Sequence, residues 1–72
     1  MQLYQLFRQA KLTPRQAEVA VLVANGYGNA SIADRLCIAE GSVKCHLTSI
    51  YLRLGVKSRL QLAVWCLRKY YS

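Results

Sequence analysis

The stretch from residue 41 to residue 54 constrains the fold more than any other part of the chain, because its apolar residues follow the period of an α-helix. They recur at i, i+4, i+7, i+8 and i+11 as Val43, Leu47, Ile50, Tyr51 and Leu54. The opposite face carries Lys44, Cys45, Thr48, Ser49 and Leu52, with no acidic side chain among them. We predict a helix that is buried along one side and that offers small, polar and basic groups to a partner on the other.

An earlier helix is predicted from the residues that cap its two ends. Thr13 precedes Pro14, which suits the first helical position, and Gln16 is spaced to close a capping box with Thr13. This helix should end at Asn25, because Gly26 readily adopts the left-handed conformation of a C-terminal cap.

The next helix should start at Gly28 or Asn29 and end near Leu36. Residues 37–40 are too few for anything but a tight turn, and Cys37 is expected to be a small hydrophobic residue of the core. Two helices joined by about four residues, the second longer and basic on its outer side, are typical of a helix-turn-helix.

Ser58 should begin the last helix, after a C-terminal cap at Gly55, with Gln61 placed to close a second capping box. One face of this helix can complete the core through Ala63, Cys66 and Leu67. Four other apolar residues are left outside: Leu60, Val64, Trp65 and Tyr71. A helix that is apolar on two sides usually has a neighbour on both, so we predict that these four residues form the interface with a second copy of the chain.

The first residues form a short amphipathic pattern of their own. One helical face would carry Leu3, Leu6, Phe7 and Ala10. We expect a short N-terminal helix or ordered arm over residues 1–11, followed by a single domain over residues 12–72. No alternation of strand type is found, so the chain is predicted to be all-α.

The charge is strongly positive for a chain of 72 residues, with ten Lys and Arg against three Asp and Glu, a formal net charge of +7. Such a balance favours a polyanionic partner, nucleic acid first. Glu18, one of the three acidic residues, is expected to form a buried or half-buried ion pair with a basic residue of the third or fourth helix. No stretch is long and apolar enough to span a bilayer, and the N-terminus has no signal-peptide pattern.

The three cysteines argue against a disulfide framework and a zinc site, because their number is odd and no Cys-x-x-Cys pair occurs. We expect a reducing cytoplasm and neither a metal nor a cofactor. His46 has no acidic or nucleophilic residue at motif spacing, so an enzyme is not predicted.

The sequence contains, in this order, Leu12-Thr-Pro-Arg-Gln-Ala-Glu-Val19, Gly26, Asn29, Ile32-Ala33, Leu36, Ser42-Val43-Lys44, His46, Ile50, Leu54-Gly55-Val56 and Ser58-Arg59. Together these residues resemble the LuxR-type helix-turn-helix domain found in the FixJ/NarL response regulators. The resemblance covers roughly residues 12–67 and implies a compact four-helix domain, with the short N-terminal helix or arm as an addition. In this family the third helix of the domain lies in the major groove of double-stranded DNA, and the fourth commonly forms the dimer contact.

The resemblance also implies roles for individual residues. Contacts to base edges would be made by Lys44, Cys45 and Thr48, where Cys45 would meet an apolar group such as a thymine methyl. Contacts to phosphates, or support for the start of the recognition helix, would come from Asn29, Ser42, His46, Lys57 and Arg59.

Several positions depart from the family pattern. Ala39 stands where Ser or Thr usually caps the recognition helix, and Ser31 replaces an acidic residue of the preceding helix. The outward face of the recognition helix is poor in hydrogen-bond donors, so DNA shape is expected to contribute to selectivity. No sensor domain precedes the helix-turn-helix in this sequence, which is the arrangement expected of a stand-alone regulator.

The sequence leaves three alternatives open. The last helix is apolar enough to pair with a larger transcription regulator, or with RNA polymerase, and to modulate it. The Gly-Ser-Val-Lys pattern also occurs in the promoter-binding region 4 of sigma factors. Binding to anionic lipid is the least favoured alternative, because the basic residues are scattered rather than aligned on one amphipathic helix.

Overall fold

The computed structural model describes residues 2–71, and this range contains helices and no strand, which confirms the all-α prediction. The helices are α1 (Leu3–Gln9), α2 (Pro14–Ala24), α3 (Asn29–Leu36), α4 (Glu40–Leu54) and α5 (Arg59–Tyr70). Met1, the first residue of the predicted segment 1–11, and Ser72, the last residue of the predicted segment 12–72, lie outside the described residues. None of the helices in the described part of the chain combines the length and the apolar character needed to cross a membrane.

The predicted caps of α2 and α4 are present. The backbone N–H of Gln16 donates to Thr13 Oγ1 at 3.1 Å, and the N–H of Thr13 donates to Gln16 Oε1 at 3.0 Å, so the capping box is complete. Gly26 and Gly55 have φ angles of 91° and 71°, in the left-handed region that a side chain disfavours. These caps fix where α2 ends and where α4 gives way to the final loop.

The second predicted capping box is half formed. The N–H of Gln61 donates to Ser58 Oγ at 3.1 Å, as expected for an N-cap. The side chain of Gln61, however, accepts from the N–H of Lys57 at 2.7 Å rather than from Ser58. The glutamine therefore ties the preceding loop to the start of α5.

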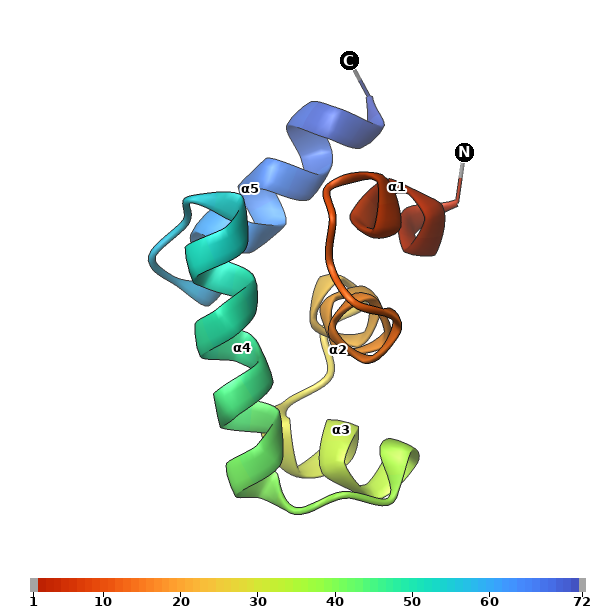
Figure 1. Cartoon of the computed structure of the whole chain (residues 1–72), viewed down its shortest axis with the longest axis vertical. Coiled ribbons are helices and arrows are strands. Elements are labelled where there is room, and N and C mark those ends of the chain that lie inside the picture. The colour runs from red at the N-terminus through yellow and green to blue at the C-terminus, as the bar shows by residue number, and fades with distance from the viewer. Residues whose placement is uncertain (1, 72) are drawn as a thin grey trace.

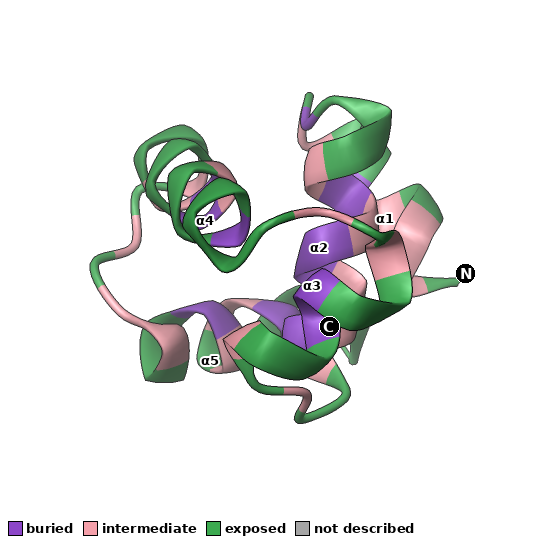
Figure 2. Cartoon of the chain, turned by 90° about the horizontal axis from the view of Figure 1, so that it is seen from below, coloured by how far each residue is buried: buried purple, intermediate pink, exposed green. Residues whose placement is uncertain are grey.

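The core is built around α2, which packs against each of the other four helices. Figure 1 shows α2 in the middle, with α4 along one side, α3 at one end of the molecule and α1 and α5 toward the other. The largest fully buried side chains come from all parts of the chain: Phe7, Leu12, Val19, Ile32, Val43, Ile50 and Leu62. In Figure 2 the buried side of α4 faces the other helices and the rest of its surface is exposed.

Three predictions about individual residues are wrong. Cys37 is exposed rather than in the core, because it adopts the left-handed conformation (φ 57°) that ends α3 and turns its side chain outward. Leu67 is 58% exposed, since the core face of α5 runs through Leu62 and Cys66 instead. Glu18 does not reach another helix but pairs with Arg15 of α2 at 3.2 Å on the surface.

The N-terminal helix α1 is an integral part of the core. Phe7 is fully buried, and its ring is stacked on that of Trp65 of α5 with 5.5 Å between centroids and 11° between planes. Trp65 is accordingly only partly exposed, whereas Leu60, Val64 and Tyr71 are exposed. The indole thus contributes to packing within the chain, which the sequence pattern did not predict.

Substitution of Ala39 by serine should stabilise the domain by about 1 kcal/mol. Ala39 is the N-cap of α4, with φ −74° and ψ 151°, and has no side-chain oxygen to accept from the N–H groups of the first turn. Thermal denaturation should therefore show a higher midpoint for Ala39→Ser than for the wild type. An unchanged midpoint would mean that water satisfies these groups equally well.

Candidate nucleic-acid interface

The helix α4 is held so that one of its sides remains free along its whole length. Val43, Leu47 and Ile50 are buried against α2 and α3, which confirms the predicted apolar stripe. The turn after α3 is tightened by the N–H of Ile38, which donates to the carbonyl of Ala33 at 3.0 Å. α3, the turn and α4 form the predicted helix-turn-helix.

The three predicted base-contacting residues, Lys44, Cys45 and Thr48, are all exposed on the free side of α4. The hydroxyl of Thr48 donates to the backbone carbonyl of Lys44 at 3.1 Å. Because a hydroxyl has one hydrogen, Thr48 can still accept a hydrogen bond from a partner but has no further hydrogen to donate. Lys44 therefore brings the strong free side-chain donor of this group, beside the weak S–H donor of Cys45.

The residues predicted to meet phosphates occupy three separate places. Ser42 is exposed in the first turn of α4, where its own N–H is bonded to the carbonyl of Ala39 at 3.0 Å, and His46 is half-buried one turn later. Lys57 is exposed in the loop before α5.

Asn29 and Arg59, the remaining two, are brought into direct contact. One terminal nitrogen of Arg59 donates to Asn29 Oδ1 at 2.8 Å, and the other donates to the carbonyl of Tyr27 at 2.5 Å. The guanidinium thereby fastens the start of α5 to the loop between α2 and α3. This bridge was not predicted, because nothing local in the sequence pairs residues that lie this far apart.

Tyr27 is also held from α3, by Arg35. The guanidinium carbon of Arg35 lies 4.2 Å from the centre of the Tyr27 ring, and one of its N–H groups donates to the Tyr27 hydroxyl at 2.7 Å. Tyr27 therefore contacts two basic side chains, Arg35 and Arg59, just before the helix-turn-helix begins.

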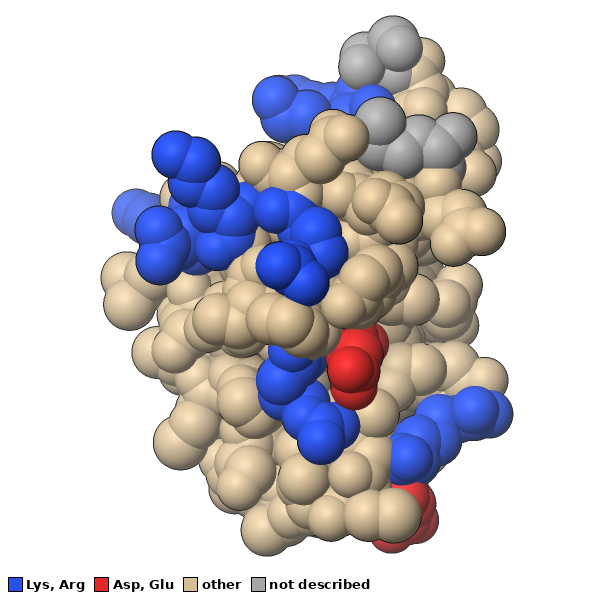
Figure 3. Space-filling model, turned by 45° about the vertical axis from the view of Figure 1, so that its right-hand side comes forward, with Lys and Arg blue, Asp and Glu red and all other residues tan. Residues whose placement is uncertain are grey.

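The charge is distributed unevenly along the sequence, since no Asp or Glu occurs after Glu40. The same part of the chain contains Lys44, Arg53, Lys57, Arg59, Arg68 and Lys69. Figure 3 shows that Lys and Arg side chains are spread over the face it presents rather than gathered in one patch. From residue 41 onward, α4 and α5 thus carry basic side chains and no acidic one, which suits a polyanion.

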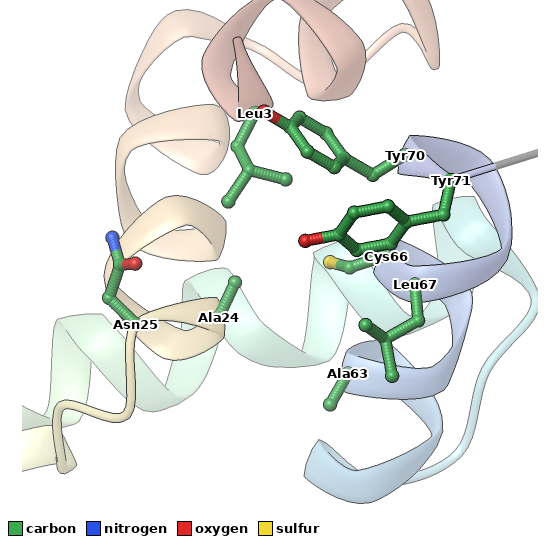
Figure 4. A pocket seen from close by; sticks show the side chains of 8 residues that line it. All are labelled: Leu3, Ala24, Asn25, Ala63, Cys66, Leu67, Tyr70 and Tyr71. Carbon is green, nitrogen blue, oxygen red and sulfur yellow. The ribbon is translucent and has the colours of Figure 1, made fainter.

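Three exposed apolar residues of α5 and the residue that follows its end form a stripe at i, i+4, i+7 and i+11: Leu60, Val64, Leu67 and Tyr71. Leu60 and Val64 line a groove beside the end of α4, together with Trp65. Leu67 and Tyr71 line a second pocket between α1, the end of α2 and α5, which Figure 4 shows with Tyr70 near Leu3. We call these four residues the α5 stripe.

The three cysteines differ in exposure to solvent. Burial raises the pKa of the Cys66 thiol from its ordinary value of 9.0 to about 11, whereas Cys37 and Cys45 are exposed. A thiol reagent at mildly alkaline pH should therefore modify Cys37 and Cys45 quickly and Cys66 only when denaturant is added. Three equally fast thiols would contradict this assignment, and Cys66→Ala provides the control for the slow phase.

The raised pKa of Cys66 also links stability to pH. The contribution of its protonated form to the stability of the fold is complete below pH 9.0 and is lost as the pH rises toward about 11.

In the described part of the chain, no three residues among His, Cys, Asp and Glu gather closely enough to hold a metal ion.

A helix-turn-helix whose second helix is exposed along one side and carries no acidic residue after Glu40 in its first turn defines a DNA-binding domain. The chain belongs to the luxR family of bacterial regulatory proteins, whose family model matches residues 10–66. It is 40% identical over 58 residues to the oxygen regulatory protein NreC of Staphylococcus aureus strains JH9, JH1 and Mu3, a match that covers 81% of this chain. The chain spans about a quarter of the length of these curated relatives, 27%. No solved structure matches it.

Proposed function

We propose that this protein is a sequence-specific regulator of transcription that binds double-stranded DNA as a dimer, with α4 of each copy in a major groove. The observation that supports this proposal best is the free side of α4, which is exposed from its first turn to its last and carries no acidic residue after Glu40. A helix of this diameter fits the major groove, where base edges can be distinguished. Such a regulator would act in the cytoplasm.

In this proposal, Lys44 donates to a base edge, Thr48 accepts from one, and Cys45 makes an apolar contact. Ser42, His46 and Lys57 anchor phosphates from α4 and the following loop, which makes affinity depend on salt. The hydrogen bond between Asn29 and Arg59 fixes the start of α3 relative to the start of α5. The guanidinium keeps further N–H donors that a phosphate can accept from.

The second copy is proposed to pack on the α5 stripe. Two large residues of the α5 stripe are mostly exposed: Leu60 is 74% exposed and Tyr71 is 76% exposed. Water contact with so much apolar surface is unfavourable, and a symmetric partner would cover it. The indole of Trp65 contributes its exposed edge, since its ring is stacked on Phe7.

The Lys44→Ala variant tests the role of α4. It should lose most of the preference for the specific site, a loss of about 1–3 kcal/mol, while weak general binding is retained. A mobility-shift series on specific and scrambled duplexes measures both affinities. Equal losses on all sequences would mean that Lys44 contacts phosphate and does not contact a base.

A second candidate function follows from the same α5 stripe. An interaction module could pair through α5 with a larger regulator or with RNA polymerase, and a sigma-like promoter-binding domain would use α4 similarly. Measurement of mass in solution, with duplex DNA and with a candidate regulator, separates these functions. Exclusive pairing with the regulator and no affinity for DNA would refute the first proposal.

A further inference from the structure

The free side of α4 has an uncharged centre. Gly41, Cys45, Thr48 and Leu52 follow one another at i, i+4, i+7 and i+11, the spacing of a single helical face, and all four are exposed. We call this row the α4 ridge. The basic residues of the helix, Lys44 and Arg53, lie on opposite sides of the ridge and not within it.

Leu52 is the most exposed large apolar residue of the described chain, at 79%. It also lines a shallow groove with Thr48, Tyr51, Gly55, Val56 and Lys57. Nothing in the fold requires a leucine here, because the core stripe of α4 lies on the other side of the helix. An alanine would suit an exposed helical position better.

The polar member of the ridge is limited by its own hydrogen bond. The hydroxyl of Thr48 donates to the carbonyl of Lys44, so toward DNA it can only accept. In the major groove the donors are the exocyclic amines of adenine and cytosine, whereas guanine offers only acceptors. An acceptor alone does not distinguish A·T from G·C, because each pair carries one exocyclic amine in the major groove; the apolar neighbours Cys45 and Leu52 favour the thymine methyl group and hence A·T pairs.

We propose that the α4 ridge reads thymine 5-methyl groups, with Leu52 as an additional specificity-determining residue beside Cys45 and Thr48. This inference rests on the proposed binding of α4 in the major groove. Charge complementarity supports DNA as the occupant: Lys44, Arg53 and Lys57 surround the apolar row, and no acidic residue follows Glu40. In the major groove, the apolar side chains of the ridge would face the thymine methyl groups, and the cations on either side would face the two phosphate backbones.

The test uses the whole chain and a duplex obtained by selection from random DNA. Each thymine of the selected site is replaced in turn by uracil, which keeps base pairing and removes only the methyl group. Binding should weaken about four-fold at a thymine under the ridge, the effect of one buried carbon. At the thymine that Leu52 contacts, the uracil effect should be lost in Leu52→Ala and should persist in Leu52→Met, whereas a thymine that Cys45 contacts should keep its uracil effect in both variants. Gln5→Ala, on the exposed side of α1, is the control and should keep the wild-type response.

The outcomes distinguish the inference from the function on which it depends. A selected site whose affinity is unchanged by uracil at every thymine would overturn methyl reading while DNA binding stands. Uracil effects of equal size in wild type and Leu52→Ala at every thymine of the site would overturn the role of Leu52. If no duplex is preferred over scrambled DNA, specific binding itself fails, and the inference fails with it.

Discussion

Phe7→Ala should lower the free energy of unfolding by about 3–5 kcal/mol, the usual cost of replacing a buried phenylalanine by alanine. Phe7 is fully buried, and its removal would also end the stacking on Trp65. A domain of this size loses about 4–8 °C of its melting midpoint per kcal/mol. Thermal and urea denaturation should therefore show the largest shift of any single substitution considered for this chain.

The matched control is Gln5→Ala, on the exposed side of the same helix. It should change stability by less than about 0.5 kcal/mol, as is usual for surface positions. If Phe7→Ala melts together with the control, α1 is a detachable arm and the domain begins at residue 12. If it melts far below the control, α1 belongs to the cooperative unit, although it lies before the residues 10–66 that match the family model.

The helices could be predicted from sequence because their signals are local. The capping box at Thr13 and Gln16 joins residues three apart, and the stripe from Val43 to Leu54 follows the helical period. The exposed side of α4 follows directly from that stripe. This is why the positions of Lys44, Cys45 and Thr48 on one free face could be predicted before the structure was known.

The features that the sequence did not predict depend on contacts between distant residues, or on a local change in which side of the chain faces the core. Phe7 and Trp65, like Asn29 and Arg59, meet only because the fold brings distant parts of the chain together. Cys37 was misplaced because its left-handed conformation shifts the inward side of the chain to Ile38.

The same kind of error affected α5, where many apolar residues leave the inward face undetermined. Leu62 is fully buried and fixes the phase, which turns Leu67 outward. Leu67 then falls in line with Leu60, Val64 and Tyr71. The correction therefore lengthens the exposed apolar row of α5 and makes it continuous, which strengthens the case for a partner on this helix.

The double variant Leu60→Gln, Val64→Gln should bind a full DNA site at least about 100-fold more weakly than wild type, because a linked second half-site multiplies affinity by about 10² to 10⁴. Both residues are exposed, so the fold should be retained, and glutamine leaves the net charge of +7 unchanged. Phosphate attraction per copy is thus the same in variant and wild type.

A duplex with a single half-site is the internal control, because only one α4 can engage it. On this duplex the variant and the wild type should have the same affinity, and the dependence on salt should have the same slope. Equal weakening on both duplexes would show that the substitutions damage α4 or its support rather than pairing. Unchanged affinity on the full site would mean that the two copies bind independently or pair elsewhere.

The separation of pairing through α5 from DNA contact through α4 matters because α4 alone offers few donors. The selectivity expected of this protein then depends on whether α5 holds two α4 helices about one turn of DNA apart.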